Sequence, residues 1–524
     1  MTTSTAENAD LTPAARALLD RALAAHTQGR FDEAEPLYRQ VLEKNPQDHN
    51  ALTNLGTIFL QRGRLGEGIP FLEASLQIKA NQANALTNLG NALTSLRRFD
   101  EALNACERSV ILQPESHDAF NNLGNVLREL ARPEEALVAY DRALALKPDF
   151  PVVLNNKGNL LRNLGRLDEA LAVLDQAIAF QGGYVEARNE KANVLAEMKQ
   201  GDAALVAYDE ALALNPEFAE AWSNKAVVLQ RLKRLDEALV AGERAVALRP
   251  DYADGLYNTA NVLVDLKRFD EALPLFDRVI ALRPDYGDAY NNRGAALQEL
   301  KRWDEALADL EKARTLSPGL AAVHGNRGNV LRAMGQLEDA LASYRHAVAL
   351  APNYLDGLNN IGIVLSEMGR PEEALAALDL AIAANPEFPD CRWNKSLLCL
   401  MTQRYTEGWR LYEWRWRQRE WVFGEMPFLE PHWLDHANLA GKSLLIRAEQ
   451  GLGDTLQMLR YMPLLADRGI RVILAVQKPL GAIARAVRGV AQVVMEGEAI
   501  PPHDFNCMIM SLPLGFETTV DTIP

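Results

Sequence analysis

The chain has 524 residues, with 70 acidic and 55 basic side chains and a formal net charge of −15. One compact hydrophobic core rarely accommodates so long a chain, so we expect either several domains or an elongated array of repeats. The acidic balance disfavours nucleic acid and anionic membrane surfaces as primary partners. A protein or peptide partner, or a neutral small molecule, fits this charge better.

Cysteine spacing and the N-terminal sequence indicate the compartment. The four cysteines lack CxxC spacing, which argues against a zinc site or a disulfide framework and predicts buried thiols in a reducing compartment; they are Cys106, Cys391, Cys399 and Cys507. The N-terminus, MTTSTAENADLTPAAR, has no apolar signal-peptide segment, and no run of about eighteen uncharged apolar residues occurs elsewhere. We expect a cytoplasmic, soluble protein without membrane insertion, in which residues 1–14 are disordered.

From residue 15 onward, a small residue recurs every 34 positions without insertion or deletion. Its positions are Ala34, Gly68, Ala102, Ala136, Ala170, Ala204, Ala238, Ala272, Ala306, Ala340, Ala374 and Gly408. Within each unit, apolar residues recur at i, i+3, i+4 and i+7 in two stretches separated by a short polar turn, which is the pattern of an αα-hairpin. A proline at a second fixed phase should end the second helix of most units. These prolines are Pro46, Pro114, Pro148, Pro216, Pro250, Pro284, Pro318, Pro352 and Pro386, with Ala80 and Gly182 as exceptions.

Another series of small residues lies in the first helix of each pair. It comprises Gly56, Gly90, Gly124, Gly158, Ala192, Ala226 and Gly294. We expect these residues to lie where the two helices of a pair cross, because the side chains at the contact set the distance between helix axes. Larger side chains there should push the pair apart.

The period and the recurring motif, "NLG" followed by alanine, an aromatic residue or leucine, a second alanine and proline, resemble the tetratricopeptide repeat. The resemblance covers roughly residues 15–422. It implies a mostly α fold, a right-handed superhelical solenoid of about twelve helix-turn-helix repeats whose concave groove is lined by the first helices. We expect eleven regular repeats in residues 15–388, then a degenerate twelfth repeat and a tryptophan-rich capping or linker region in residues 389–440.

Asparagine occupies one fixed phase of the first helix, two positions before the small residue, in nearly every unit. These asparagines, called the asparagine ladder below, are Asn54, Asn88, Asn122, Asn156, Asn224, Asn258, Asn292, Asn326, Asn360 and Asn394, and Asp20 and Glu190 interrupt the series. A second asparagine often follows three positions later, on the same helical face. Asparagine is a mediocre helix former, so the series requires a reason.

Two interpretations of the asparagine ladder are open. Its amides either donate to and accept from the backbone of an extended polypeptide, or they bond between neighbouring helices and hold the repeats together. The first interpretation is favoured, because the series resembles the ladder at the matching phase in the solenoid of O-linked N-acetylglucosamine transferases. We therefore predict that the ten asparagines bind an extended polypeptide without reading its sequence. The identity of the partner and the oligomeric state do not follow from the sequence.

The regular pattern weakens in the twelfth unit, and six of the eight tryptophans fall between Trp393 and Trp433. Trp409, Tyr412 and Trp416 lie at i, i+3 and i+7, which predicts one apolar helix face that docks a second domain. Arginines interleaved with these aromatic residues could instead stack on single-stranded nucleic acid. The acidic chain and the helical spacing disfavour that alternative.

From residue 441 the periodicity changes. "KSLLIRA" is a short apolar run, "EQGLG" a turn, "DTLQMLRYMPLLADRG" an amphipathic helix and "IRVILAV" a second apolar run. This β-loop-α-β pattern predicts a small, partial, Rossmann-like α/β segment with a parallel sheet in residues 441–524. Gly451 and Gly453 permit a sharp turn that brings backbone N–H groups near a ligand, and Asp454 follows at the helix N-terminus. The simplest alternative is that Asp454 only caps the helix.

The stretch "GLGDTLQMLRYMPLL" resembles the first strand–helix junction of heptosyltransferase-like glycosyltransferases with the GT-B fold. The whole arrangement resembles bacterial proteins in which tetratricopeptide repeats precede such a domain. The resemblance implies that Asp454 is the catalytic base toward an acceptor hydroxyl, that Gly451 and Gly453 form the ligand loop, and that a nucleotide sugar is the donor substrate of the full-length parent. The histidine motif of O-linked N-acetylglucosamine transferases is not found, so their chemistry does not carry over.

A GT-B enzyme needs two Rossmann-like halves, and residues 441–524 account only for the N-terminal one. We therefore expect this chain to be inactive and to bind no cofactor by itself. His432 and His436 are four residues apart, but no third ligand is evident, so no metal site is predicted. The expected function is a protein-interaction scaffold joined to a truncated glycosyltransferase-like domain, whose parent modifies a protein or a glycan. The alternative is a purely structural scaffold with a vestigial, non-catalytic tail.

Overall fold

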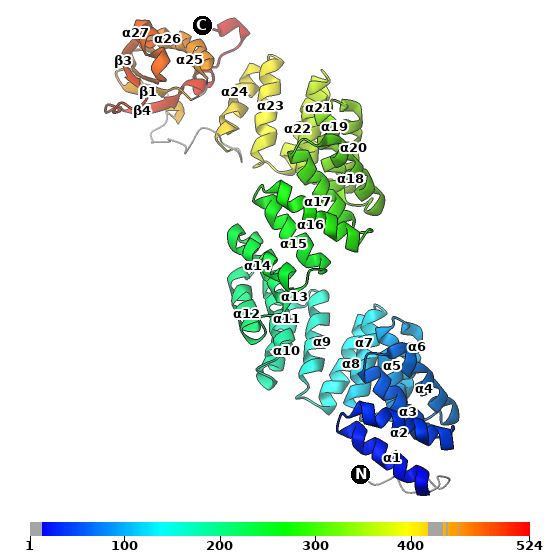
Figure 1. Ribbon diagram of the computed structural model, residues 1–524. Helices are drawn as coiled ribbons and strands as arrows, with labels where there is room; N and C mark the ends of the chain where they lie inside the picture. The colour runs from blue at the N-terminus through cyan, green and yellow to red at the C-terminus, as the bar shows by residue number, and fades with distance from the viewer. Residues whose placement is uncertain (1–12, 418–432, 436–438, 450) are drawn as a thin grey trace. The chain divides into compact units, whose positions relative to one another are not determined.

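The computed structural model of the protein describes residues 13–417, 433–435, 439–449 and 451–524. The chain divides into two compact units, Met1–Leu266 and Lys267–Pro524 (Figure 1). This division falls within the run of regular repeats, and the predicted boundaries at residues 388 and 440 stay predictions. Residues 1–12, most of the segment predicted to be disordered, lie outside the described residues, and the first helix begins at Pro13.

The first unit is all-helical within its described residues, and helices α1 to α14 pair in sequence order as successive hairpins. The bounds are α1 Pro13–Thr27, α2 Phe31–Lys44, α3 His49–Gln61, α4 Leu65–Ile78, α5 Ala83–Ser95, α6 Phe99–Leu112, α7 His117–Glu129, α8 Pro133–Leu146, α9 Pro151–Asn163, α10 Leu167–Phe180, α11 Val185–Glu197, α12 Gly201–Leu214, α13 Ala219–Arg231, α14 Leu235–Leu248 and α15 Ala253–Asp265.

The second unit begins with further helices of similar length, except for the shorter α24. Their bounds are α16 Phe269–Leu282, α17 Gly287–Glu299, α18 Trp303–Leu316, α19 Ala321–Ala333, α20 Leu337–Leu350, α21 Leu355–Glu367, α22 Pro371–Ala384, α23 Pro389–Met401 and α24 Tyr405–Tyr412. Helices α17 to α24 again pair as successive hairpins. The predicted fold class, a mostly α tetratricopeptide repeat solenoid with a small α/β segment, is confirmed.

The second helix of every pair from α1–α2 to α21–α22 ends at a constant phase. Helix α6 ends at Leu112, two residues before Pro114, as the proline pattern predicts. Helix α4 ends at the same phase, at Ile78, although Ala80 replaces the proline there. The proline is therefore not required to end the helix at this phase, and at the end of α4 Nε2 of Gln82 donates to the carbonyl oxygens of Ser75 and Lys79, at 2.9 Å each.

Small residues let the two helices of a pair approach closely, as predicted. A Cβ atom on Gly124 would lie 2.5 Å from Cε1 of the buried Tyr140 on the paired helix. Gly56 and Gly68 face each other, and a Cβ on Gly68 would lie 2.8 Å from the carbonyl oxygen of Gly56. A side chain at either contact would require the helices to separate.

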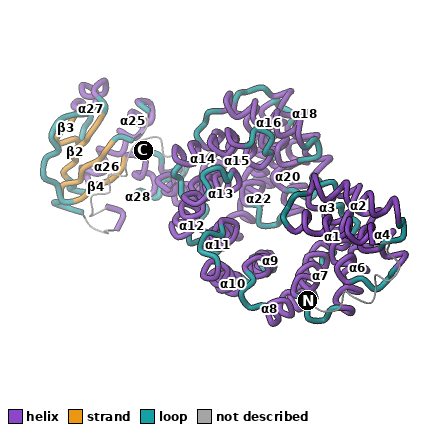
Figure 2. The backbone as a smooth tube through the Cα atoms, turned by 60° about the horizontal axis from the view of Figure 1, so that its bottom comes forward, coloured by secondary structure: helices purple, strands orange, loops and turns teal. Residues whose placement is uncertain are grey.

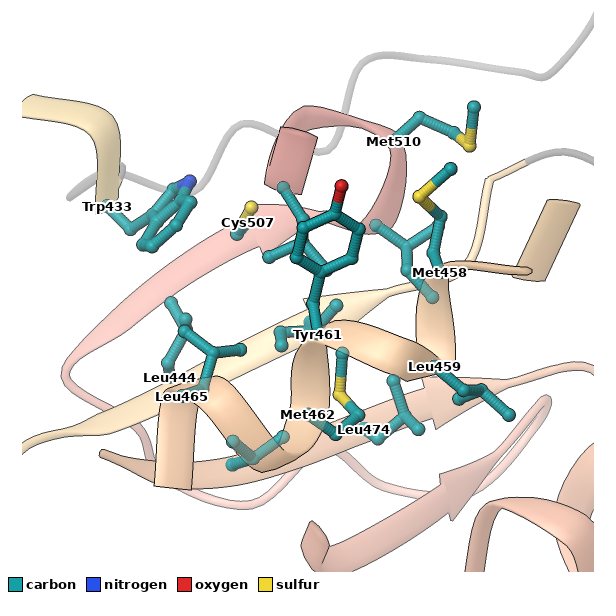
Figure 3. Packing of buried hydrophobic residues seen from close by; sticks show 14 of the residues in the cluster. Trp433, Leu444, Met458, Leu459, Tyr461, Met462, Leu465, Leu474, Cys507 and Met510 are labelled. Carbon is teal, nitrogen blue, oxygen red and sulfur yellow. The ribbon is translucent and has the colours of Figure 1, made fainter. Parts of the chain in front are cut away.

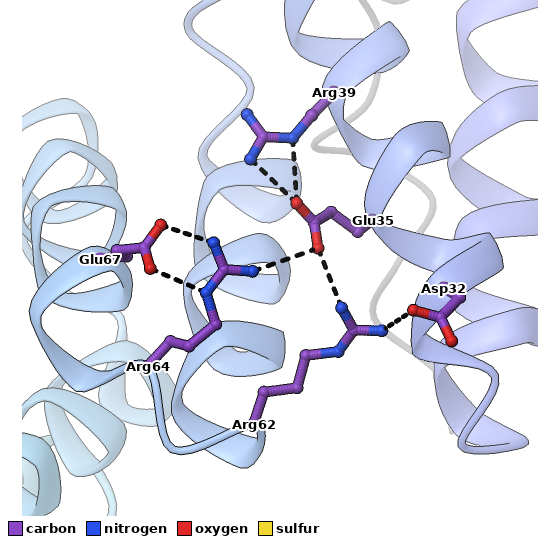
Figure 4. A network of polar contacts seen from close by, with 6 residues as sticks. All are labelled: Asp32, Glu35, Arg39, Arg62, Arg64 and Glu67. Atoms are coloured by element: carbon purple, nitrogen blue, oxygen red, sulfur yellow. Dashed lines mark hydrogen bonds and ion pairs between the residues drawn. The ribbon is translucent and has the colours of Figure 1, made fainter.

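Ion pairs connect the first two repeats (Figure 4). Glu35 of α2 accepts hydrogen bonds from Arg39 on its own helix, at 2.9 Å, and from Arg62 after α3, at 3.3 Å. Arg64 pairs with Glu67 at 2.6 Å, and the same Arg-x-x-Glu contact begins the second helix of several other repeats. Largely exposed pairs of this kind contribute about 0–1 kcal/mol each, so apolar packing dominates the stability of the repeats.

The C-terminal α/β segment, residues 441–524, contains a parallel sheet of four strands in the order β3-β2-β1-β4 (Figure 2). The strands are β1 Ser443–Arg447, β2 Arg471–Val476, β3 Val490–Met495 and β4 Phe505–Met508, and the short helices are α25 Leu452–Met458, α26 Met462–Asp467, α27 Gly481–Ala486 and α28 Leu512–Gly515. The one helix predicted between the first two strands is divided by a 3-10 turn, Leu459–Tyr461, which comes just before Pro463.

The two faces of the sheet have different cores. Alternate residues of β1 and β2, such as Leu444 and Leu474, pack against side chains of α25 and α26, such as Met458 and Leu465, in one large apolar cluster (Figure 3). On the other face, Leu445, Ile473 and Val494 form a small separate cluster. Strand alternation produces this division, because successive side chains point to opposite faces.

The predicted buried thiols are confirmed, because all four cysteines are buried and unpaired. None of the helices in the described ranges is long and apolar enough to cross a membrane.

Candidate functional site

All ten residues of the asparagine ladder lie on first helices, and each side chain is half-buried. They are Asn54 on α3, Asn88 on α5, Asn122 on α7, Asn156 on α9, Asn224 on α13, Asn258 on α15, Asn292 on α17, Asn326 on α19, Asn360 on α21 and Asn394 on α23. The shared phase predicted from the sequence therefore places them at equivalent positions of successive repeats.

Most of these amides donate a hydrogen bond to the first helix of the preceding repeat. Nδ2 of Asn156 lies 3.1 Å from Oδ1 of Asn121 and 3.2 Å from Oδ1 of Asn125. Equivalent bonds run from Asn88 to Thr57, Asn122 to Thr87, Asn224 to Asn193, Asn258 to Ser223, Asn326 to Asn291, Asn360 to Asn329 and Asn394 to Asn359. These are the bonds expected if the asparagine ladder holds neighbouring repeats together. Its role in binding a peptide stays a prediction.

A buried tyrosine on the second helix fixes the acceptor of some of these bonds. The hydroxyl of Tyr140 donates to Oδ1 of Asn125 at 2.8 Å, and that oxygen also accepts the bond from Asn156. The same three-residue arrangement recurs with Tyr208 and Tyr344. Burial raises the pKa of Tyr140 to about 12, so its hydroxyl remains a donor at neutral pH. Sequence reasoning missed this network, although a tyrosine 15 residues after the second asparagine was the available signal.

Glu190 takes the ladder position on α11 and forms a buried charged cluster. It accepts hydrogen bonds from Asn159 at 3.0 Å and from Asn193 at 3.0 Å, and it pairs with Arg162. The carboxylate is thus satisfied on both oxygens, as a buried charge requires. Glu190 therefore still connects neighbouring repeats, through charge-assisted hydrogen bonds in place of the neutral ones that asparagine makes.

One polar groove gathers three ladder residues in the first unit. A cavity of about 650 Å³ lies among α3, α5 and α7, and Asn54, Asn88 and Asn122 line it. Thr53, Thr57 and Thr87 add hydroxyl groups, and the remaining lining residues are also largely polar; they are His49, Asn50, Lys79, Asn81, Gln82, Ala83, Asn84, Ala85, Gln113, Ser116 and Asp118. This groove presents many hydrogen-bonding groups and little apolar surface, which suits the backbone of an extended chain.

The candidate base, Asp454, lies in the first turn of α25 and not at its N-cap. The helix begins at Leu452, so Asp454 is its third residue, and Oδ2 accepts a hydrogen bond from the backbone N–H of Gly451 at 3.2 Å. Gly453 lies inside the helix and not in the turn before it, which corrects the predicted loop. Neither glycine has a positive φ, so the observed backbone does not require glycine at these positions.

The tryptophan-rich region also differs from the prediction. Helix α24 ends at Tyr412, and a 3-10 helix, Glu413–Arg417, follows, so Trp416 does not continue the helix face of Trp409 and Tyr412. Tyr412 and Trp409 pack against the apolar cluster of the α/β segment, as expected of a docking surface. Within this 3-10 helix, the side chain of Arg415 is buried.

Arg415 forms a buried ion pair at the carboxyl end of the sheet. Nε and Nη2 contact the two carboxylate oxygens of Glu449, just after β1, at 2.9 and 3.1 Å, and both side chains are 1% exposed. Nη1 pairs with Glu413 at 2.8 Å, and Nη2 donates to Ser511 at 2.9 Å. Burial raises the pKa of Glu449, and the arginine partly offsets this. Sequence reasoning missed this pair, because no spacing pattern connects its members.

Among the described residues, no group of three or more potential ligands could hold a metal ion. His432 and His436 lie outside the described residues.

Successive hairpins of constant length and period define the class of the protein, an α-helical repeat solenoid. Family models of the tetratricopeptide repeat match residues 19–84, 81–149, 127–192, 217–285, 285–353 and 319–387, and the chain therefore belongs to the tetratricopeptide repeat family. The comparison with curated proteins returned no match.

Solved structures of similar fold include other repeat proteins. The APC/C hetero-tetramer Cut9–Hcn1 is 13% identical with a TM-score of 0.43, over 76% of this chain and 93% of that one. A tetratricopeptide repeat protein from Parabacteroides merdae ATCC 43184 is 17% identical with a TM-score of 0.42, over 48% and 100% of the two chains. YrrB, described as a TPR protein with an unusual peptide-binding site, is 25% identical with a TM-score of 0.30, over 38% and 97%.

Proposed function

We propose that this tetratricopeptide repeat scaffold binds an extended polypeptide in the polar groove among α3, α5 and α7, and that it does so in the cytoplasm. The observation that carries the proposal is the convergence of three ladder amides and three threonine hydroxyls on one cavity of about 650 Å³. A peptide backbone offers one donor and one acceptor per residue, and the amides can pair with both. The hydroxyls of Thr57 and Thr87 already donate to the carbonyl oxygens of Thr53 and Ala83, so they serve the peptide as acceptors. The cytoplasmic location rests on the four buried, unpaired cysteines.

The bonds between repeats and the binding of a peptide are compatible roles for one amide. An asparagine side chain has two N–H donors and an acceptor oxygen. In Asn88, Nδ2 contacts Oγ1 of Thr57 at 2.9 Å, and in Asn122 it contacts the carbonyl oxygen of Thr87 at 3.4 Å. One N–H group so used holds the amide in place, and the second N–H group and the oxygen serve the peptide. A side chain that is already ordered loses less entropy on binding.

Removal of two groove amides should weaken binding without unfolding the repeats. Peptides are selected from an unbiased library on the full chain and titrated against the double variant Asn88→Ala/Asn122→Ala. Each lost hydrogen bond is worth about 1 kcal/mol, so we expect affinity to fall about tenfold or more. The matched control is Asn104→Ala, which removes an exposed amide from the second helix α6.

Equal affinities for the double variant and the native chain would assign the ladder to stability alone. Loss of affinity that parallels loss of helical structure in the double variant would lead to the same conclusion.

A second candidate function concerns the C-terminal α/β segment. We infer a glycosyltransferase-like role in which Asp454 is the base and a nucleotide sugar is the donor. The observation that favours it is the half-buried Asp454 at the junction of β1 and α25, because ligands of parallel α/β sheets bind at the carboxyl ends of the strands. A general base must lie within hydrogen-bond reach of the acceptor hydroxyl. The half-buried side chain of Asp454, at the carboxyl edge of the sheet, remains accessible to such a hydroxyl.

Intact mass after incubation of a selected peptide with a panel of nucleotide sugars tests this second candidate. Transfer that Asp454→Asn abolishes and Asp467→Asn preserves would support the enzyme, since Asp467 is an exposed carboxylate at the end of α26. Absence of transfer from every donor would contradict this role for residues 1–524 and support a vestigial tail.

A further inference from the structure

A second cavity lies at the carboxyl ends of β1, β2 and β3, apart from the groove and from Asp454. Its volume is about 350 Å³, and it is lined by residues at the end of each strand or just after it: Arg447, Ala448, Glu449, Ala475, Val476, Gln477, Val494, Met495, Glu496, Gly497, Glu498 and Ile500. Cavities of this size hold small molecules, and the carboxyl edge of a parallel sheet is where such folds bind them.

Arg447, the last residue of β1, supplies an uncompensated positive charge to this cavity. Its Nε is buried without a hydrogen-bond partner. It follows Leu445 by two positions, so its side chain lies on the face of the small cluster of Leu445, Ile473 and Val494, opposite the face that packs on α25. Burial lowers the pKa of Arg447, and no neighbouring carboxylate offsets that effect.

The nearby carboxylates do not neutralise Arg447. Glu449 is bonded to Arg415 and to the backbone N–H of Met510. Glu498 accepts the backbone N–H of Met495 at 2.8 Å, and it is exposed at the rim, as is Glu496. Two arginines thus lie at the same edge of the sheet, and only Arg415 has acidic partners. A half-buried guanidinium without a counterion is costly unless a ligand supplies one.

We propose that this cavity binds a small organic molecule that carries a single oxyanion group, a phosphate monoester or a carboxylate, which the guanidinium of Arg447 recognises. A guanidinium fits both groups through two parallel N–H donors. Ala475, Val494 and Ile500 provide an apolar wall for the body of the ligand. The rim carboxylates Glu496 and Glu498 disfavour molecules with several negative charges and can accept hydrogen bonds from hydroxyl groups. The inference does not depend on peptide binding or on catalysis by Asp454.

Isothermal titration of the full chain with glucose 6-phosphate, glucuronate, glucose and inorganic pyrophosphate tests the proposal. We expect one of the first two probes to bind at one site per chain, which identifies the group as phosphate or carboxylate, and we expect glucose and pyrophosphate to bind at least about tenfold more weakly. Arg447→Met should weaken the bound probe about tenfold or more, because it removes a charge-assisted contact. The matched control, Arg471→Met, removes an exposed arginine from the opposite end of β2 and should leave affinity unchanged.

Three results would overturn the proposal: no binding of either anionic probe, equal binding by Arg447→Met, or an equal loss in the two arginine variants. Arginine-selective modification with butanedione, read by mass spectrometry on the native sequence, gives an answer even if Arg447→Met does not fold. The bound probe should protect Arg447 and leave Arg471 reactive, and protection of neither arginine would contradict the proposal.

Discussion

Replacement of Arg415 by methionine is expected to destabilise the C-terminal α/β segment by about 3–5 kcal/mol. The substitution leaves Glu449 buried after β1 without its counterion, and Glu413 and Ser511 lose the guanidinium that they share. Hydrogen exchange of the amides in β1 and β4 reports the loss directly, because these neighbouring strands end beside the pair. The helices of the first unit should keep their protection.

The double variant Arg415→Met/Glu449→Leu is the control for this prediction. Replacing both partners by apolar residues of similar volume removes the unpaired charge, so most of the lost stability should return. A double variant as unstable as Arg415→Met would show that the pair is not the cause.

The Arg415→Met defect should also depend on pH. Burial raises the pKa of Glu449 above its unfolded value, so the folded state binds the proton more tightly and stability rises as pH falls through that range. Without Arg415 that pKa rises further than in the native chain, so the deficit relative to the native chain should shrink as pH falls toward the usual carboxyl range.

Replacement of Gly124 by valine is expected to destabilise the pair α7–α8 by about 3 kcal/mol. The new Cβ would lie 2.5 Å from the ring of Tyr140, which is fully buried and whose hydroxyl is bonded to Asn125. The ring cannot move without breaking that bond, so the helices must separate. Urea unfolding with hydrogen exchange on α7 and α8 measures the effect.

Gly182→Val is the matched control, since nothing lies within 4 Å of a Cβ at Gly182. We expect it to change stability by less than about 0.5 kcal/mol. If Gly124→Val is as stable as this control, the close approach of α7 and α8 does not matter for stability.

The repeats could be predicted from the sequence because the contacts that define them are local. A period of 34 residues places both helices of a pair within one short stretch of chain, and the apolar spacing identifies the face that each helix buries. The phase of the asparagine ladder was visible for the same reason. Its partners were not, because Asn156 bonds to Asn121 only once neighbouring repeats are stacked.

The C-terminal segment was less predictable, since its important contacts join distant residues. The strands could be recognised from their apolar runs, but Arg415 and Ser511 are 96 positions apart and no motif links them. The helix was predicted to begin at Asp454, but it begins two residues earlier, at Leu452, so Asp454 is its third residue. The proposed role of Arg447 rests on its buried Nε, which has no hydrogen-bond partner, and this can be seen only in the folded structure.

Hydrogen exchange of the full chain with and without a library-selected peptide tests the central claim most directly. If the peptide lies along the asparagine-lined groove, protection should increase on the first helices α3, α5 and α7, which line the cavity, and much less on the second helices α4 and α6. Increased protection confined to α4 and α6, or no change on α3, α5 and α7 under saturating peptide, would contradict the account.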